Sequence, residues 1–366
     1  MPSSKVLWMR AFGNSPASAK CPAQCSDGGD VDVLLGRVDV LRSFLITIDT
    51  EGDDIWSRRS SVETRNASFL PRFQSLCENF GLKPTYLVNF EMANDPGFIE
   101  FGRDLIARGV GEIGMHLHAW NSPPSHRLTS NDSWHQPFLI EYPENEIRKK
   151  IEYQTHLLED VFGVKMLSHR SGRWALNAFY ANVLRDLGFK VDCSVTPHVD
   201  WRGIKGDPDG AGGSDYRGFP EQHYWMSERD ITLGGGASLL EVPMTIINRS
   251  PAFLTRATQS CEDISDLPDR TRRYIWPLDW LRPNGSNLKS MLRILDIAIS
   301  QNRPYVEFMT HSSELMPGGS PYFPTVESVE KLYRDLNELF SQAAKHFCGS
   351  TLTEFHDRVV RSCSDD

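Results

Sequence analysis

Residues 111–120 read GEIGMHLHAW, an apolar run that ends in two histidines, His116 and His118. In a β-strand, residues two apart point to the same face, so the two imidazoles would be neighbours. Two explanations are open at this point. The pair could be hydrogen-bonded at the rim of a barrel, or it could bind a metal, because neutral imidazole is the commonest metal ligand. The choice depends on which other side chains reach the same place.

Short apolar or β-branched runs of this kind recur along the chain and alternate with amphipathic helical stretches. The predicted strands are 43–49, 84–90, 112–118, 165–170, 190–197, 238–246 and 304–311, and the predicted helices are 65–80, 96–109, 143–163, 175–188, 287–300 and 325–347. This alternation favours parallel strands joined by right-handed crossovers. Seven such units predict an α/β fold of the (β/α)7-barrel kind in a single domain.

The seven units lie within residues 43–350, which we predict to form the barrel domain. Residues 1–42 have little periodicity and are rich in Ser, Gly, Asp and Pro, so we expect a loosely ordered N-terminal arm. Residues 351–366 follow the last predicted helix and are expected to form a C-terminal tail.

The composition restricts the partners. The chain of 366 residues has a formal net charge of -9, which argues against nucleic acid and against an anionic membrane surface. No apolar run reaches the length of about 18 residues that a transmembrane helix needs, and the N-terminal apolar run is too short for a signal peptide. Seven scattered cysteines do not indicate a disulfide framework, so we expect a cytoplasmic protein. The oligomeric state is left open.

Unusual polar side chains stand at the ends of four predicted strands. They are Asp49, Glu51, Asp53 and Asp54 after the first strand, His116 and His118 at the third, His169, Arg170, Arg173 and Trp174 at the fourth, and His311 at the last. In such barrels the chemistry lies at the carboxyl ends of the strands. A carboxylate with two imidazoles suits Zn, Fe, Co, Ni or Mn. The convergence therefore favours a metal site over a simple hydrogen-bonded histidine pair.

The strand-end motifs resemble those of the polysaccharide deacetylase family, also called carbohydrate esterase family 4 or the NodB-homology fold. That family usually has T-F-D-D-G where this chain has TIDTEG (47–52), H-(S/T)-x-x-H where it has HLHAW (116–120), and R-P-P-(Y/W) where it has RSGRW (170–174). Its last motif has a histidine in an apolar context, as in FMTHS (308–312). The resemblance covers about residues 43–320. It implies a distorted (β/α)7 barrel that removes N- or O-acetyl groups from sugars.

Two motifs depart from the usual pattern together. Thr50 stands in place of the second Asp, and Glu51, one residue later, is the natural substitute. The second histidine comes two residues after the first, and Trp120 stands where the family has it. The D-T-E and H-L-H-x-W motifs look most like the WalW-type branch, which is found among lipopolysaccharide-sugar biosynthesis proteins. The resemblance thus implies a sugar of a bacterial surface polysaccharide or of its precursor.

The proposed metal ligands are Glu51, His116 and His118, and the implied cofactor is one divalent ion. Zinc is favoured, with Co, Ni, Mn or Fe as alternatives. Asp53 could replace Glu51 as a ligand, and His118 could support the ligands rather than bind the ion itself. The first of the two histidines is the safest assignment.

By the resemblance, Asp49 is the catalytic base and Arg170 the arginine that holds it in place. We expect His311 to be the general acid, because it ends the last strand and an imidazole can carry a proton before the step and be neutral after it. The alternatives are a loop-capping carboxylate, an ordinary ion pair at the barrel rim, and a histidine that caps the turn after the last strand.

Arg173, Trp174 and Trp120 are the candidate substrate-binding residues. The arginine stands where the family has an aromatic residue and could bind a carboxylate or phosphate on the substrate. The two tryptophans could form a wall for a sugar ring, although most tryptophans simply pack in the core. The loops 201–220 and 279–287 are further candidates for substrate contacts.

The sequence therefore predicts a metal-dependent hydrolase that removes an acyl group, preferably N-acetyl, from a sugar. Two other classes stay open. One is a non-catalytic sugar-binding protein on the same scaffold, which the altered motifs motivate. The other is a metal-dependent deformylase or linear amidase. No G-x-S-x-G motif appears, and no G-x-G-x-x-G follows the first strand, so a serine hydrolase and a dinucleotide enzyme are disfavoured.

Overall fold

A computed structural model describes residues 42–55, 62–130, 132, 138–204, 206, 209–236, 238–249 and 277–364 of the chain. Of the predicted N-terminal arm, residues 1–41 lie outside the described residues. The following paragraphs concern the described ranges.

Seven parallel strands form the centre of the fold. They are β1 (Ser43–Thr50), β2 (Pro84–Val88), β3 (Glu112–Leu117), β4 (Ser168–Ser171), β5 (Val191–Asp192), β7 (Leu240–Glu241) and β10 (Tyr305–His311). Their order is β10-β1-β2-β3-β4-β5-β7, and each neighbouring pair is parallel. The predicted α/β fold, with seven parallel strands in a distorted barrel, is confirmed.

Four short strands were not predicted. Strand β6 (Tyr224–Trp225) pairs antiparallel with β7, and β11 (Cys348–Ser350) pairs parallel with β1. Strands β8 (Ile246–Asn248) and β9 (Leu278–Trp280) form a separate antiparallel pair. Each contains two or three residues, which is too short for a period-two pattern to be recognised.

The barrel is not closed by a backbone ladder, because β7 and β10 do not pair. The chain that follows β7 fills this seam with individual contacts. The hydroxyl of Tyr305 donates to the carbonyl oxygen of Pro243 at 2.9 Å, and the backbone N–H of Glu307 donates to Oγ1 of Thr245 at 2.8 Å. The seam explains why the barrel is distorted.

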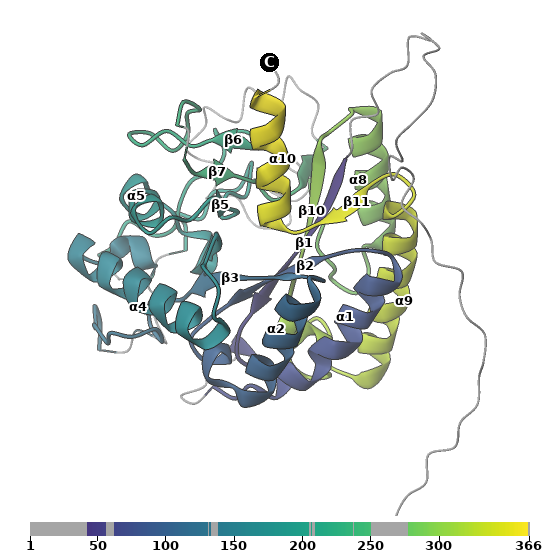
Figure 1. The fold of residues 1–366 in the computed structure, drawn as a ribbon, viewed down its shortest axis with the longest axis horizontal. Helices are drawn as coiled ribbons and strands as arrows, with labels where there is room; N and C mark the ends of the chain where they lie inside the picture. The colour runs from purple at the N-terminus through teal and green to yellow at the C-terminus, as the bar shows by residue number, and fades with distance from the viewer. Residues whose placement is uncertain are drawn as a thin grey trace, which may run out of the picture. The chain divides into compact units, whose positions relative to one another are not determined.

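The helices lie around the outside of the strands (Figure 1). They are α1 (Leu70–Asn79), α2 (Pro96–Arg108), α4 (Glu144–Phe162), α5 (Ala178–Asp186), α8 (Leu288–Ser300), α9 (Val326–Ala343) and α10 (Leu352–Ser364). Side-chain caps start four of them: the side chains of Asp95, Asn177, Thr325 and Thr351 accept from the backbone N–H groups of Phe98, Tyr180, Ser328 and Glu354. Helix α10 lies in the segment 351–366, which was predicted to be a C-terminal tail. Across the described part of the chain, no helix combines the length and the apolar character that a membrane span requires.

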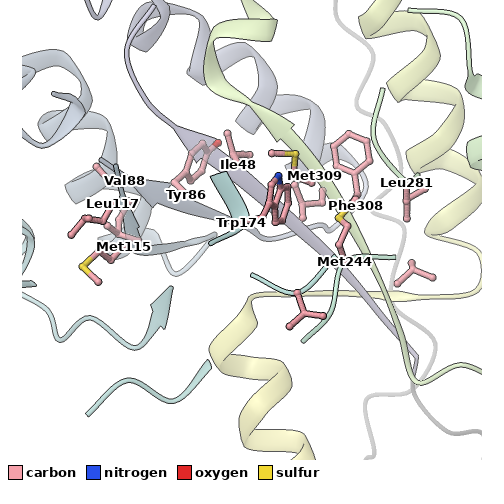
Figure 2. Close-up of a cluster of buried hydrophobic side chains, with 14 of the residues drawn as sticks. Ile48, Tyr86, Val88, Met115, Leu117, Trp174, Met244, Leu281, Phe308 and Met309 are labelled. Carbon is pink, nitrogen blue, oxygen red and sulfur yellow. The ribbon is translucent and has the colours of Figure 1, made fainter. Parts of the chain in front are cut away.

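Alternate residues of β1 belong to two separate apolar clusters, as the pleat of a strand requires. Phe44, Ile46 and Ile48 pack in the larger cluster, between the strands and the surrounding helices. Figure 2 shows part of it, including Tyr86 and Phe308. The larger cluster fixes the strands against the helices and so positions the strand ends.

The second cluster fills the barrel interior near the beginnings of the strands, and α10 covers it. We call it the apolar floor. Its buried members are Leu45, Leu87, Val191, Cys193, Leu240, Val242, Tyr305, Leu352, Phe355 and Val359. The floor occupies one end of the interior, and the polar side chains that line the cavity described below lie at the other end, where the strands finish.

Candidate metal and catalytic centre

The predicted site residues come together around one cavity at the carboxyl ends of the strands. The cavity has a volume of about 300 Å³. Its lining includes Asp49, Glu51, His116, His118, Trp120, Arg173, Trp174 and His311, together with Ile55, Phe138, Trp201, Ile204 and Arg282. Arg170 does not line the cavity and is fully buried. The register of the sheet explains the convergence, since Asp49 lies opposite His311 and His116 opposite Arg170 on adjacent strands.

Glu51, His116 and His118 form a compact buried cluster. One nitrogen or oxygen of each lies within 4.8 Å of those of the other two. Nε2 of His118 is 2.7 Å from Oε2 of Glu51, and Nε2 of His116 is 3.5 Å from the same oxygen. The two Nε2 atoms are 3.1 Å apart. Three potential ligand atoms therefore face one point at the edge of the cavity.

The surroundings of His116 indicate which of its nitrogens carries a proton. Nδ1 lies 2.9 Å from the backbone carbonyl oxygen of Arg170. A carbonyl oxygen only accepts, so Nδ1 donates, and Nε2 of the neutral ring has a lone pair that faces the cluster. An imidazole held through its other nitrogen in this way is the usual arrangement of a metal-binding histidine.

Two buried atoms of the cluster have no hydrogen-bond partner within the described ranges, Oε1 of Glu51 and Nδ1 of His118. Leaving a buried polar atom unpaired is costly, above all on a charged group. A cation at the cluster would satisfy the glutamate. One carboxylate and two imidazoles, with a cavity on the open side, fit a divalent ion that keeps a free position for substrate.

The pKa shifts of the residues in this cluster also favour the binding of a cation. Burial by itself raises the pKa of Glu51, but its interactions with His116, His118 and His311 together outweigh burial and hold the pKa well below its ordinary value. Burial lowers the pKa of His118 and favours its neutral form. Burial also acts to lower the pKa of His116, but its interactions with Asp49 and Glu51 together outweigh burial and raise the pKa. Two buried carboxylates thus supply negative charge that a metal cation would balance.

Asp53, the alternative ligand, points away from the cluster. Its Oδ1 accepts hydrogen bonds from the backbone N–H and the side-chain amide of Asn66 at 2.9 and 2.7 Å, and its Oδ2 accepts from Arg65 at 3.0 Å. Both oxygens are therefore used to hold the loop that follows β1. Glu51 is the carboxylate that reaches the histidines.

Arg170 crosses the barrel interior beneath the cavity. Its Nη1 donates to Oδ1 of Asp49 at 2.6 Å, and its Nη2 donates to Oγ1 of Thr47 at 2.7 Å and contacts the carboxylate of Glu307. Its Nε donates to the backbone carbonyl oxygen of Cys193 at 3.1 Å. The guanidinium is thus anchored on β1, on β10 and on the residue that follows β5, and it fixes one oxygen of Asp49.

The two carboxylates on Arg170 behave differently. Burial alone raises the pKa of Asp49, but the charges of Arg170, His116 and His311 together outweigh burial and leave the pKa below its ordinary value. At Glu307 burial prevails over Arg170 and raises the pKa to about 7. Asp49, at the cavity, is therefore ionised at neutral pH.

His311 faces Asp49 and Glu51 from the neighbouring strand. Its Nε2 lies 3.8 Å from Oδ2 of Asp49 and 3.5 Å from Oε1 of Glu51. Its Nδ1 lies 3.0 Å from Nη2 of Arg282 and 3.7 Å from Oε2 of Glu314. Arg282 and Glu314 also form an ion pair of 3.0 Å. These contacts fix the ring with Nε2 toward the cavity.

Aromatic side chains form the walls of the cavity. The ring of Trp120 lies 4.3 Å from that of His118, between centroids, and the guanidinium of Arg173 lies 4.6 Å from the ring centroid of Phe138. Arg173 and Trp174 both have left-handed backbone conformations, with φ of 58° and 61°. Consecutive residues of this kind are strained, and such strain is concentrated at functional sites.

His169, which the sequence placed with the other strand-end residues, lies elsewhere. Its Nδ1 is 2.6 Å from Oδ1 of Asp192 and its Nε2 is 2.9 Å from the hydroxyl of Tyr180. Neighbouring strand residues point to opposite faces, so Arg170 faces the barrel interior and His169 faces helix α5.

Three contributors to the site were not singled out from the sequence: Glu307, Arg282 and Phe138. Glu314 was noted beside His311, with a cap of the following turn as the alternative. Glu307 could have been found from the sequence, because it lies four residues before His311 on the same strand and so points to the same face. Arg282 lies in the stretch 279–287 that was singled out for substrate contacts, but no pattern selected it there. Phe138 had no signal, since its place depends on the path of a long loop.

No family profile and no curated protein matches the sequence. Among solved structures, the chain is similar to a protein from Mycobacterium smegmatis provisionally assigned as a polysaccharide deacetylase, with 15% identity, a TM-score of 0.47 and coverage of 90% of this chain and 94% of that chain. It is also similar to a GH57 branching enzyme from Thermococcus kodakaraensis (10% identity, TM-score 0.48, coverage 86% and 71%). A third is a carbohydrate esterase family 4 pseudoenzyme from Bacillus anthracis (10% identity, TM-score 0.36, coverage 86% and 66%). Because these sequence identities and TM-scores are low, any statement about function has to rest on the arrangement of the side chains.

Proposed function

We propose that the protein is a metal-dependent hydrolase that removes an acyl group, in the first place an N-acetyl group, from a sugar. One observation carries the proposal: a buried Glu-His-His cluster shares a cavity with an ionised aspartate, Asp49, and a histidine, His311. A metal-binding cluster, a base and an acid around one space are the parts that hydrolysis of an amide or ester requires.

Glu51, His116 and His118 would hold one divalent ion, with zinc as the first choice and Co, Ni, Mn or Fe as alternatives. Such an ion would act as a Lewis acid on the acyl group and make water a better nucleophile at neutral pH. The backbone carbonyl of Arg170 keeps His116 in the orientation that binding needs.

Asp49 is the proposed general base. Its Oδ1 is held by Arg170, so its Oδ2, which is 4.0 Å from Nε2 of His116, is the oxygen that can accept a proton from water. Because its pKa lies below the ordinary value, the carboxylate is ionised at neutral pH and can accept a proton there. Arg170 is a positioning residue, since it transfers no proton itself.

His311 is the proposed general acid, and its Nε2 would donate a proton to the departing amine or alkoxide. We expect His311→Ala to lower the rate of amide deacetylation by roughly 10²–10⁴-fold, the usual contribution of such a group. Hydrolysis of 4-nitrophenyl acetate should change little, because that leaving group departs without protonation. The measurement is the ratio of the two kcat values in folded, metal-loaded protein.

His156→Ala is the matched control for this test, because His156 lies on α4 away from the cavity. If His311→Ala slowed the ester and the amide equally, the histidine would have another role, such as capping the turn that follows β10.

Arg173, Trp120 and Trp174 are proposed to bind the substrate. The two tryptophans offer faces on which a sugar ring can pack, and the guanidinium of Arg173 can bind a carboxylate or phosphate. The resemblance of the D-T-E and H-L-H-x-W motifs supports a sugar of a bacterial surface polysaccharide, such as lipopolysaccharide, or of its precursor. On the sequence arguments given above, we propose a cytoplasmic location.

Release of acetate and formate from a panel of N-acetyl, O-acetyl and N-formyl sugars and linear amides tests the proposed function. We expect an acetylated sugar to be the best substrate, a chelator to stop the reaction and Zn²⁺ to restore it. Preference for formyl groups or linear amides would instead identify a deformylase or amidase. Metal binding without release of any acyl group would favour a non-catalytic sugar-binding protein.

A further inference from the structure

Both histidines of the proposed metal cluster lie against the end of one neighbouring strand, β4. Nδ1 of His116 is 2.9 Å from the backbone carbonyl oxygen of Arg170. His118 has no such backbone anchor, because its Nδ1 is buried without a hydrogen-bond partner among the described residues. Besides its contact with Glu51, the ring of His118 is placed by packing, and Gly172 lies directly against it.

Gly172 leaves space that any other residue would fill. It is buried directly after β4, beside the end of β3. A Cβ atom at this position would lie 2.7 Å from Nδ1 of His118 and 2.4 Å from the backbone carbonyl oxygen of Leu117. At such distances the atoms overlap, so the ring or the strand would have to move. The φ angle of Gly172 is not left-handed, so the glycine is needed for close approach and not for its backbone conformation.

The chain turns sharply directly after Gly172. The next two residues, Arg173 and Trp174, both have left-handed backbone conformations. The hydroxyl of Ser171 donates to the backbone carbonyl oxygen of Ala175 and so closes this turn. The turn therefore holds the backbone of Gly172 in place beside the ring.

A buried hydrogen-bond network supports the same backbone from the other side. The N–H of Ser171 donates to Oγ of Ser194 at 2.9 Å, and this hydroxyl donates to Oδ1 of Asp192 at 3.0 Å. Nδ1 of His169 lies 2.6 Å from the same carboxylate oxygen. All four side chains are buried. His169, which the proposed reaction does not use, thus belongs to the support of the β4 end.

We propose that Gly172 is a positioning residue of the metal cluster. The side chain that it lacks is what allows His118, only two residues after His116, to turn toward Glu51. This inference rests on the proposed function, because it takes His118 as a metal ligand. A larger residue at position 172 would displace the ring of His118, whose Nε2 is 2.7 Å from Oε2 of Glu51.

Gly172→Ala tests the proposal, with Zn²⁺ affinity measured by competition with a chelator. We expect Zn²⁺ binding to weaken by about 10–100-fold, the usual cost of losing the support of a metal ligand. Gly349→Ala is the matched control. In β11 a Cβ at Gly349 would lie 2.3 Å from the carbonyl oxygen of Gly81, so the position is as crowded, but it does not line the cavity. This control should lower the thermal stability and leave the Zn²⁺ affinity unchanged.

A double-mutant cycle identifies the contact through which Gly172 acts. In the metal-free protein, Gly172→Ala should lower the unfolding temperature less when His118 has already been replaced by alanine. The reason is that the ring which the new methyl group meets is then absent, and residues in contact show such coupling.

If Gly172→Ala does not fold, Ser194→Ala takes its place, because it removes the acceptor of the Ser171 N–H. We expect it to weaken Zn²⁺ binding by about tenfold. Ser168→Ala is the matched control, since Ser168 is buried on the same strand and its hydroxyl makes no hydrogen bond within the described residues. Its Zn²⁺ affinity should be unchanged.

Equal Zn²⁺ affinity in Gly172→Ala and Gly349→Ala would overturn the proposal, as would equal destabilisation by Gly172→Ala with and without the ring of His118. For the second pair, equal Zn²⁺ affinity in Ser194→Ala and Ser168→Ala would have the same meaning. Failure of the proposed function alone would look different. The zinc-loaded protein would then release no acyl group, while the Zn²⁺ affinities of the variants would still differ.

Discussion

His116→Ala is expected to give a folded protein that binds no stoichiometric divalent metal and releases no acyl group above background. The substitution removes one of the three proposed ligands, the one whose Nδ1 lies 2.9 Å from the backbone carbonyl oxygen of Arg170. Loss of a supporting hydrogen bond alone costs a metal site roughly 10–100-fold in affinity, so loss of a ligand should cost more. Elemental analysis after loading with Zn²⁺ and desalting measures the effect.

Two controls make this test specific. Asp53→Asn should keep the metal, because both oxygens of Asp53 are engaged by Asn66 and Arg65, whereas Glu51→Gln should lose it. His126→Ala removes a histidine that lies outside the cluster and should also keep the metal. Metal content that is the same in His116→Ala and in the original protein would mean that the site has been misassigned.

Asp49→Asn is expected to lower kcat for deacylation by roughly 10²–10⁴-fold while the metal content stays unchanged. The amide has the shape of the carboxylate but cannot accept the proton. It also leaves the buried Arg170 with one charged partner fewer, and breaking a buried ion pair costs about 3–5 kcal/mol when no other partner remains. Because Thr47 and Glu307 still contact Arg170, the loss of stability should be smaller than that.

Thermal unfolding of Asp49→Asn must therefore accompany the kinetics, with Asp53→Asn as the matched control. Full activity in folded Asp49→Asn would remove Asp49 from the mechanism. Low activity in a protein that no longer binds metal would show instead that the substitution disturbs the neighbouring cluster.

The sequence predicted these strands and the convergence of their ends because three of the longer parallel strands carry a residue of marked chemistry at or near the carboxyl end. Asp49, His116 and His311 each follow a short run rich in apolar and β-branched residues, which is typical of a buried strand. Parallel strands then bring their ends to one edge, so the convergence followed from the fold class alone.

The parts that were not predicted depend on long-range packing. Strands of two or three residues, such as β6 and β9, carry no recognisable period. The ion pair of Arg282 with Glu314 joins two loops whose approach depends on the β8–β9 pair. The sequence left open whether Glu51 or Asp53 faces the histidines, because spacing alone does not show which carboxylate turns inward. In the structure, Asn66 donates two hydrogen bonds to Asp53 and holds it away from them.

The apolar floor has a consequence for the charges above it. Its residues keep water away from the lower side of Arg170, so that the guanidinium acts on Asp49 through a medium of low dielectric constant. A charge in such a medium exerts a stronger field than the same charge in water. Because the fold fixes these charges in place, little reorganisation energy would be spent when the proposed reaction changes the charge distribution. The apolar floor, which lies at the end of the barrel away from the cavity, thereby strengthens the electric field that Arg170 exerts at Asp49.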